Sequence, residues 1–407
     1  MFIKRNLETA FKAANASFSV LLLTGARQVG KTTFLRHIAE KSRKFVSLDN
    51  LDYRLMAKND PRLFLSNFPP PVIIDEIQYA PELLPYIKMM IDEARFKNSP
   101  DCNGMFWLTG SQQFQMMKGV TESLAGRVAI FNLLGLSNRE LAGQANQPFL
   151  PETFSNNGIT MVGAPEFFHR VWRGSFPGII TRTDSDWQIF YDSYVQTYVE
   201  RDVRDLTQVG DLGRFFSFLK AAAARTGQLL NYSSLARDAD ISQPTAKSWM
   251  SILVTSGLAY LLYPYYKNLN KRMVSTPKLY FLDTGLAAYL TSWNTPQALS
   301  AGAMSGAFFE TWCIAELLKS YLHSGLQAPF FYYRDKEMQE IDLLIEYNGI
   351  LHPVEFKKSA ALKKNDIANF GVLEKFKMPL GGGALISLSP ETIMMTAKCH
   401  AVPAPLL

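Results

Sequence analysis

One stretch of sequence decides the fold of the first part of the chain: residues 20–33 read VLLLTGARQVGKTT. The apolar run predicts a buried strand, the glycines a tight loop, and the residues from Lys31 onward a helix. Residues 25–32 fit the pattern G-x-x-x-x-G-K-[ST], in which a loop between a strand and a helix encloses phosphate groups. A pattern this short also arises by chance, but the apolar strand before it and the amphipathic helix after it argue against chance.

The expected chemistry of this loop follows from its residue types. Glycines let successive backbone N–H groups point inward, and the helix adds its positive end, so phosphate oxygens are attracted. Lys31 is expected to reach the β- and γ-phosphates, and the Thr32 hydroxyl to bind Mg²⁺. The predicted nucleotide-binding residues are Gly25, Ala26, Arg27, Gln28, Val29, Gly30, Lys31, Thr32 and Thr33. The loop therefore predicts binding of a nucleoside triphosphate.

The composition indicates a globular chain with several domains. Its 407 residues suffice for two or three domains, and 47% of them are hydrophobic and 19% charged. A formal net charge of +6 permits a nucleic-acid partner without requiring one. Three widely spaced cysteines indicate neither a disulfide framework nor a zinc site. Residues 1–5 lack the apolar core of a signal peptide, and no apolar run is long enough to span a bilayer, so a cytoplasmic protein without a membrane partner is expected.

A second apolar run ends in two carboxylates. Residues 71–76 read PVIIDE, which predicts a strand buried on both faces of a parallel sheet. Ligands of such sheets bind at the carboxyl ends of the strands, so Asp75 is expected to bind Mg²⁺ directly or through water. Glu76 is the predicted catalytic residue that polarises the attacking water. The alternative, that both carboxylates only cap a helix, is weakened by the loop upstream.

Two further positions are candidates for contact with the γ-phosphate. Residues 104–111 read GMFWLTGS, and a polar residue at the end of this strand can report the presence of that phosphate. Thr109 and Ser111 both fit, and the sequence does not decide between them. Arg127 follows a glycine and is a candidate arginine finger, acting in cis or from a neighbouring subunit. A surface salt bridge is an equally good interpretation of Arg127.

Five strings in the chain carry a resemblance to a known family. They are TGARQVGKTT (24–33), IIDEIQ (73–78), LTGS (108–111), YVERDVRDL (198–206) and KLYFLDTGL (278–286). The strings resemble those of bacterial and archaeal AAA-type ATPases. More narrowly, they resemble the subfamily whose C-terminal domain of unknown function is similar to PD-(D/E)XK, or restriction-endonuclease-like, nucleases.

The resemblance implies an α/β fold class with three kinds of domain. Residues 1–150 would form a P-loop, AAA-type ATPase domain with a RecA-like parallel sheet that uses ATP and Mg²⁺. Residues 151–211 would be a helical linker region, residues 212–290 a winged helix-turn-helix, and residues 300–407 an α/β restriction-endonuclease-like domain.

The middle of the chain shows the winged-helix pattern directly. From residue 212, three helical segments precede two strands, at residues 258–263 and 278–282, which are expected to pair. The connection between the strands is basic and contains Lys267, Lys271 and Arg272, so phosphate contact is plausible. The outward face of the third helix carries a single charge, which gives little support to base readout. Such modules bind DNA in some proteins and only transmit the nucleotide state in others.

The C-terminal part places acidic and basic residues on neighbouring strands. Asp342 lies on one predicted strand, an Asn348-Gly349 hairpin turn follows, and Glu355 and Lys357 share one face of the next strand. Glu310 lies on the helix before them. Glu310, Asp342 and Glu355 are the candidate ligands of a second Mg²⁺ or Mn²⁺, since these ions favour oxygen. Lys357 is expected to orient or deprotonate water, so Asp342, Glu355 and Lys357 are the candidate nuclease residues.

These observations predict an ATP-hydrolysing, AAA-type protein coupled to a nuclease-like domain that acts on or binds DNA or another structured nucleic acid. The alternative is a nucleotide-operated switch or scaffold in which the nuclease fold is inactive. A protein-remodelling machine is a weaker third hypothesis, because the sequence shows no aromatic-hydrophobic-glycine pore loop. A homo-oligomer or a protein partner is compatible with all three.

Overall fold

The computed structural model describes residues 2–97, 102–110, 119–120, 122–154, 158–198, 211–266 and 276–407, without the side chain of Tyr198. Several positions discussed above lie outside these residues: Ser111, residues 199–206, Lys267, Lys271 and Arg272. Among the helices described, none combines the length and the apolar character needed to cross a membrane.

The N-terminal domain is built on a five-stranded sheet in the order β2-β3-β4-β1-β5, with all neighbours parallel. Its strands are β1 (Val20–Thr24), β2 (Lys44–Ser47), β3 (Val72–Asp75), β4 (Phe106–Thr109) and β5 (Val128–Asn132). The helices and the 3₁₀ turn of this domain are α1 (Glu8–Asn15), α2 (Lys31–Ile38), α3 (Leu51–Asn59), α4 (Pro61–Asn67), η1 (Ile77–Tyr79), α5 (Leu83–Phe96) and α7 (Asn138–Leu141). The prediction of a parallel, P-loop type sheet is confirmed.

The side chains of β1 point alternately into two different hydrophobic cores. Val20 and Leu22 pack into a core confined to the N-terminal domain, while Leu21 and Leu23 face a second, much larger core. Side chains of a strand alternate between its faces, so helices are required on both sides of the sheet. The larger core continues through the rest of the chain to Leu407.

The middle region contains helices and a small antiparallel sheet in the order β6-β8-β7. Its first helices are α8 (Ala164–Arg173), α9 (Pro177–Ile180), η2 (Asp184–Asp186) and α10 (Trp187–Tyr198). There follow α12 (Leu212–Ala223), β6 (Gln228–Leu229), α13 (Tyr232–Asp238), α14 (Gln243–Thr255), β7 (Ala259–Leu262), β8 (Lys278–Phe281), α16 (Thr284–Leu290) and α17 (Pro296–Ala301). Strands β7 and β8 pair as expected from the sequence, and β6 is an additional short strand.

The C-terminal domain places helix α18 (Ser305–Leu322) against a six-stranded mixed sheet in the order β13-β14-β12-β11-β10-β9. The elements after α18 are β9 (Phe330–Arg334), β10 (Glu340–Tyr347), β11 (Ile350–Lys357), η4 (Lys364–Phe376), β12 (Gly383–Ser387), β13 (Ile393–Thr396), β14 (Cys399–Pro403) and η5 (Ala404–Leu406). The predicted hairpin turn joins β10 to β11, with positive φ at both Asn348 and Gly349.

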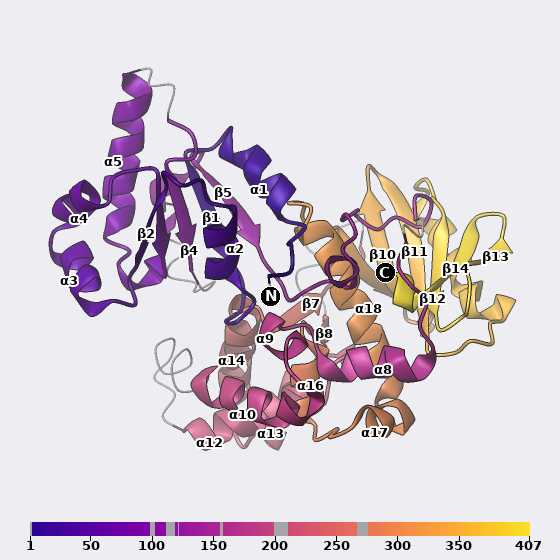
Figure 1. Ribbon diagram of the computed structural model, residues 1–407. Helices are drawn as coiled ribbons and strands as arrows, with labels where there is room; N and C mark the ends of the chain where they lie inside the picture. Colours follow the sequence, from indigo (N-terminus) through magenta and orange to yellow (C-terminus); the bar gives the residue numbers. More distant parts are fainter. Residues whose placement is uncertain are drawn as a thin grey trace.

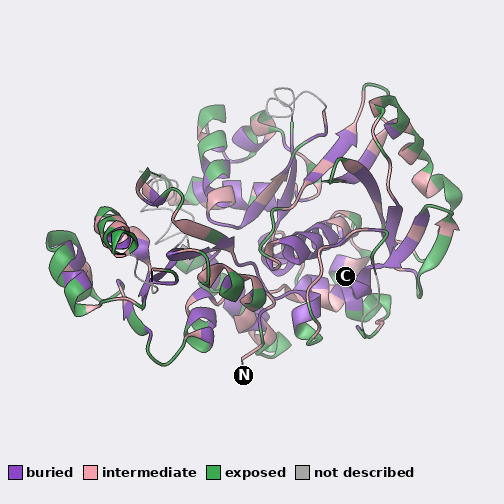
Figure 2. Cartoon of the chain, turned by 90° about the horizontal axis from the view of Figure 1, so that it is seen from above, coloured by how far each residue is buried: buried purple, intermediate pink, exposed green. Residues whose placement is uncertain are grey.

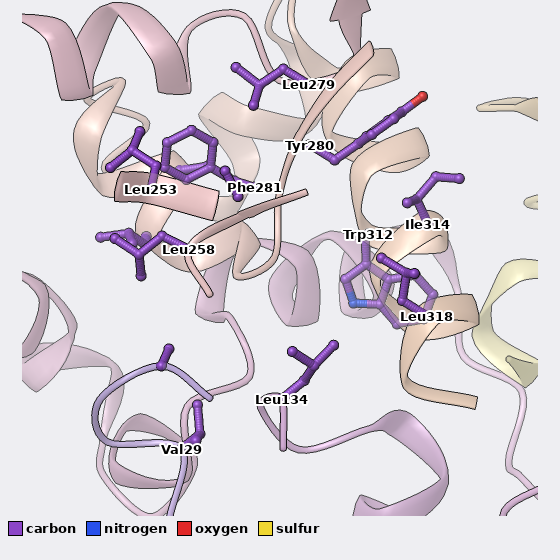
Figure 3. Close-up of a cluster of buried hydrophobic side chains, with 14 of the residues drawn as sticks. Val29, Leu134, Leu253, Leu258, Leu279, Tyr280, Phe281, Trp312, Ile314 and Leu318 are labelled. Carbon is purple, nitrogen blue, oxygen red and sulfur yellow. The ribbon is translucent and has the colours of Figure 1, made fainter. Parts of the chain in front are cut away.

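Helix α18 lies between the three parts of the molecule (Figure 1). It is buried on nearly every side, and it stands out as a continuous buried element in Figure 2. Figure 3 shows Trp312 and Leu318 of this helix in one cluster with Val29 of the phosphate-binding loop and Leu258, which precedes β7. A single apolar core thus joins the N-terminal loop, the middle region and the C-terminal domain.

Candidate functional site

The backbone of the phosphate-binding loop requires glycine at its first position. Gly25 has a φ of 144°, and a Cβ there would lie 2.2 Å from the carbonyl oxygen of Leu133. Gly30, with a φ of 92°, immediately precedes α2 and lets the loop turn into the helix. The loop therefore has the strand, turn and helix context that the motif needs.

The Lys31 ammonium group is folded onto the loop. It donates hydrogen bonds of 2.9 Å to the carbonyl oxygens of Gly25 and Ala26, and the residue is 8% exposed. An ammonium group that donates to backbone carbonyls at this position can also donate to a phosphate oxygen, which is a stronger acceptor because it is charged. The position of Lys31 agrees with its expected role.

Asp75 is the centre of a hydrogen-bonded cluster at the carboxyl edge of the sheet. Its Oδ1 accepts from the hydroxyls of Thr32, at 2.8 Å, and Thr109, at 2.5 Å. The Ser47 hydroxyl, at the end of β2, lies 3.5 Å from Oδ2. The Thr32–Asp75 pair brings together the two oxygen ligands predicted for Mg²⁺ and fits that ion.

Glu76 directly follows β3 in the left-handed region, with φ 60° and ψ 48°. Its backbone N–H donates to the Thr109 hydroxyl at 3.0 Å, and its carboxylate accepts from Gln78. This conformation is strained for a residue other than glycine. It turns the chain at the end of β3 and thereby sets the direction of the Glu76 side chain. The structure therefore places Glu76 beside Asp75 at the same edge as the loop.

Thr109 and Arg127 lie at opposite edges of the sheet. Thr109 ends β4 and contacts Asp75, as expected of a residue that senses the γ-phosphate. Arg127 precedes β5, whose first residue pairs with the first residue of β1, so Arg127 lies at the amino edge, away from the loop. There it forms a salt bridge with Asp92 at 2.6 Å. This position argues against a finger in cis, and action from a neighbouring subunit stays a prediction.

Arg5 supports the loop from behind, and the sequence analysis did not identify it. Arg5 is 3% exposed, and its guanidinium donates to the carbonyl of Val29 at 2.9 Å and to that of Leu134 at 2.7 Å. Its Nε lies 3.1 Å from Oε1 of Glu140. A positive residue near the start of a chain normally indicates solvent exposure, so no pattern in the sequence pointed to this contact.

The Glu140 carboxylate connects Arg5 to the end of α18. Nδ1 of His323, the residue after α18, lies 3.3 Å from Oε1 of Glu140. Burial would raise the pKa of Glu140, but His323 and Arg5 outweigh it and hold that pKa well below its usual value. Burial lowers the pKa of His323, and Glu140 opposes this shift. The loop and the C-terminal helix thus share one buried ionic network.

A cavity of about 270 Å³ adjoins the loop on the side of the N-terminal segment. Its lining includes Phe2, Ile3, Val29, Gly30, Pro177 and Gly178. The Phe2 ring stacks on His37 of α2, with 3.6 Å between ring centroids. Apolar side chains next to exposed backbone amides are typical of a small-molecule site, so this cavity extends the loop into a fuller pocket.

The C-terminal carboxylates gather around a lysine from another part of the chain. Lys278 of β8 is 4% exposed, and its Nζ lies 3.3 Å from Glu310, 2.6 Å from Glu340 and 3.2 Å from Asp342. The backbone N–H of Asp342 faces the Glu355 carboxylate at 3.5 Å. The structure brings Glu310, Asp342 and Glu355 close together, and it adds Lys278 and Glu340, which no sequence pattern indicated.

The pKa values of acidic side chains in this cluster are strongly shifted. Burial and the neighbouring Asp342 raise the pKa of Glu355 to about 9 and that of Glu310 to about 7. Burial would lower the pKa of Lys278, yet Glu310, Asp342 and Glu340 reverse this and raise it. Lys278 therefore stays charged, while the cluster holds part of its carboxyl groups protonated near neutral pH.

The predicted nuclease geometry is only partly present. Lys357 forms a salt bridge with Asp366 at 3.1 Å, and its side chain is 49% exposed. Within the described part of the chain, no group of three or more His, Cys, Asp or Glu side chains is arranged to hold a metal ion. With the Lys278 ammonium among the carboxylates, the residues do not fit the second Mg²⁺ or Mn²⁺.

We predict that Arg5→Met lowers the free energy of unfolding by about 3–5 kcal/mol, because it leaves Glu140 buried without its guanidinium partner. The matched control is Lys12→Met, which removes an exposed cation from α1 and its ion pair with Glu8. That control should cost no more than about 1 kcal/mol. Chemical denaturation checks both, and equal losses would contradict the network.

We also predict that stability falls as pH rises from about 5 to about 8, by up to about 1.4 kcal/mol per pH unit for each of two carboxyl groups. Because the pKa values of Glu355 and Glu310 are raised in the folded state, the folded chain binds more protons than the unfolded chain there. The groups facing these acids are Lys278, Tyr280, Glu340 and Asp342. Denaturation of the wild type and of Glu355→Gln across this range checks the slope, which the variant should reduce.

Comparison with known proteins agrees with the N-terminal geometry. Residues 17–142 match the family model described as AAA domain. Residues 164–297 and 305–407 match two models that are each described as a domain of unknown function, DUF8612 and DUF4143. Uncharacterized proteins of Mycobacterium bovis and Mycobacterium tuberculosis are both 29% identical over 366 residues, which cover 88% of this chain and 74% of each relative.

Two solved structures show remote similarity. A Walker-type ATPase of Pyrococcus abyssi is 16% identical, with 71% of this chain and 96% of that chain covered and a TM-score of 0.42. Cdc6p from Pyrobaculum aerophilum is 11% identical, with 71% and 92% covered and a TM-score of 0.25. The AAA match spans the parallel sheet, the phosphate-binding loop and the Asp75–Glu76 pair. Residues 17–142 are therefore similar to an AAA domain in sequence, and they contain the parallel sheet and the loop that such a domain would use.

Proposed function

We propose that the protein is a Mg²⁺-dependent ATPase that works as a nucleotide-operated switch, with its C-terminal nuclease-like fold serving as a docking scaffold. The observation that carries the ATPase part is the hydrogen bonding of Thr32, Asp75 and Thr109 beside Glu76. These residues come from α2, β3 and β4, yet they meet at one edge of the sheet. Hydrolysis of a bound triphosphate requires this arrangement of loop, metal ligands and base.

Each residue has a defined part in the proposed reaction. Lys31 exchanges the carbonyls of Gly25 and Ala26 for phosphate oxygens. Thr32 and Asp75 would hold Mg²⁺, which would neutralise charge on the phosphate groups. Glu76 orients and polarises the attacking water, and Thr109 contacts both Asp75 and the backbone of Glu76, so it can relay the presence of the γ-phosphate.

The cavity beside the loop supports a nucleotide rather than a simple phosphate. It is lined by apolar residues of the N-terminal segment and by residues that flank and form α9, including Pro177 and Gly178. A purine base is flat and largely apolar, and it would fill such a space while the phosphates lie on the loop. Because α9 belongs to the middle region, base binding there would tie that region to the ATPase domain.

Two contacts connect the loop to the rest of the chain and support the switch. Arg5 holds the Val29 carbonyl and shares Glu140 with His323 at the end of α18. Gly257 lies against Ala26: a Cβ on Gly257 would be 3.1 Å from the Ala26 backbone nitrogen. A rearrangement of the loop around phosphate would therefore act on both α18 and the start of β7.

The order of helices and strands from α12 to β8 supports a winged helix as the transmitting module. The outward face of α14 offers little charge for base readout, since Lys247 lies over the Tyr232 ring, 5.7 Å from its centroid. Contact with DNA or structured nucleic acid therefore stays a prediction, as does a homo-oligomer. The position of the Lys278 ammonium among the carboxylates is the observation that favours a scaffold over an active nuclease.

We predict that Glu76→Gln retains ATP binding and lowers the turnover number by at least about a hundredfold, because the base is lost while the loop stays intact. The matched control, Glu82→Gln, changes an exposed glutamate next to α5 and should leave turnover unchanged. Phosphate release and equilibrium binding of a fluorescent ATP analogue check the two properties. Unchanged turnover in Glu76→Gln would contradict the assigned role.

The scaffold part of the proposal has its own test. Purified full-length protein is incubated with single-stranded, duplex and branched DNA in Mg²⁺ or Mn²⁺, with ATP, ADP or no nucleotide. The proposal predicts no cleavage under any condition. Cleavage that disappears in the combined variant Asp342→Ala and Lys357→Ala would show an active nuclease and would contradict the scaffold.

A further inference from the structure

The Lys278 ammonium lies among three carboxylates and donates hydrogen bonds to two of them, Glu310 and Asp342. An ammonium group has three N–H donors, and Nζ lies within 3.3 Å of carboxylate oxygens on three residues, Glu310, Glu340 and Asp342. The Tyr280 hydroxyl, two residues further along β8, donates to the same Glu310 oxygen at 2.5 Å. Strand β8 thus inserts two side chains into the C-terminal domain.

The acids around Lys278 come from separate elements that only the folded chain brings together. Glu310 lies on α18, Glu340 and Asp342 on β10, and Glu355 on the neighbouring β11. Burying several carboxylates together is costly unless a cation lies among them. A divalent metal ion would meet that need in a nuclease site, but here the ammonium group of the chain itself meets it.

We infer that Lys278 takes the position of a metal ion, so that the acidic cluster is a lock that fastens β8 of the middle region to the C-terminal domain. A few consecutive contacts connect the phosphate-binding loop to this lock. Gly257 contacts Ala26 of the loop, β7 begins two residues later, and β7 pairs with β8 over Leu262 and Lys278. The residues of the lock lie outside residues 17–142, so its metal-binding properties can be tested without ATP hydrolysis.

The charge on Lys278 should decide whether the acidic cluster binds a divalent metal ion. With Lys278 in place, the cluster should reject divalent ions, because an added ion would meet a buried positive charge. With a neutral residue of similar length, the same carboxylates lose their cation and should accept one. Lys278→Met is therefore the informative variant, and Lys278→Arg, which keeps a positive charge, is its matched control.

The test is a titration of nucleotide-free, full-length protein with Mn²⁺, in which electron paramagnetic resonance measures the free ion. Wild type and Lys278→Arg are expected to bind Mn²⁺ no better than the same proteins carrying Asp342→Asn. Lys278→Met is expected to gain one site, with an affinity at least about tenfold above the remaining binding, that Asp342→Asn removes.

Two results would overturn the inference. One is Mn²⁺ binding by the wild type that Asp342→Asn abolishes, since the cluster would then accept a metal beside Lys278. The other is a folded Lys278→Met variant that gains no site. If Lys278→Met does not fold, the comparison of the wild type with Asp342→Asn still decides, because it needs no change at Lys278.

Discussion

The hydrogen bond from the Arg5 guanidinium to the Val29 carbonyl is the interaction on which the rest of the structure depends. It supports the phosphate-binding loop at Val29, and the same guanidinium is held by Glu140, which also faces His323. These charges are fully buried, so each one requires the others. As a result, movement of the loop relative to His323, the residue after α18, would disturb the buried Arg5–Glu140 ion pair.

The chain uses buried cations at both of its distinctive sites, with different consequences. Lys31 donates to the backbone carbonyls of Gly25 and Ala26, and a phosphate oxygen is a stronger acceptor than a carbonyl. Lys278 is already paired with carboxylates, so a phosphate oxygen would not be a stronger partner for its ammonium group. This contrast underlies the proposal that the chain binds a nucleotide at one site and excludes a metal ion at the other. The apolar core shared by α18 and the loop, visible in Figure 3, keeps the two sites in one rigid unit.

Sequence reasoning succeeded where function depends on local patterns. The loop, the strand that ends at Asp75 and the β10–β11 hairpin are encoded within short stretches, so periodicity and glycine placement were sufficient. It failed where the partners are distant: Arg5 meets Glu140 across 135 positions, and Lys278 meets Asp342 across 64. Lys357 had the right spacing for a nuclease, but its side chain pairs with Asp366 instead. Side-chain direction and long-range ionic partners depend on tertiary packing, which a motif does not contain.

The central claim is that ATP binding at the loop changes the stability of the structure around Lys278. The most direct measurement is hydrogen exchange, followed by mass spectrometry, of the full-length protein without nucleotide and with Mg²⁺ and ATP. The account predicts that protection changes in residues 20–33 are accompanied by changes in β8 and in α18. Changes confined to residues 2–142 would show that the two sites are not coupled and would contradict the account.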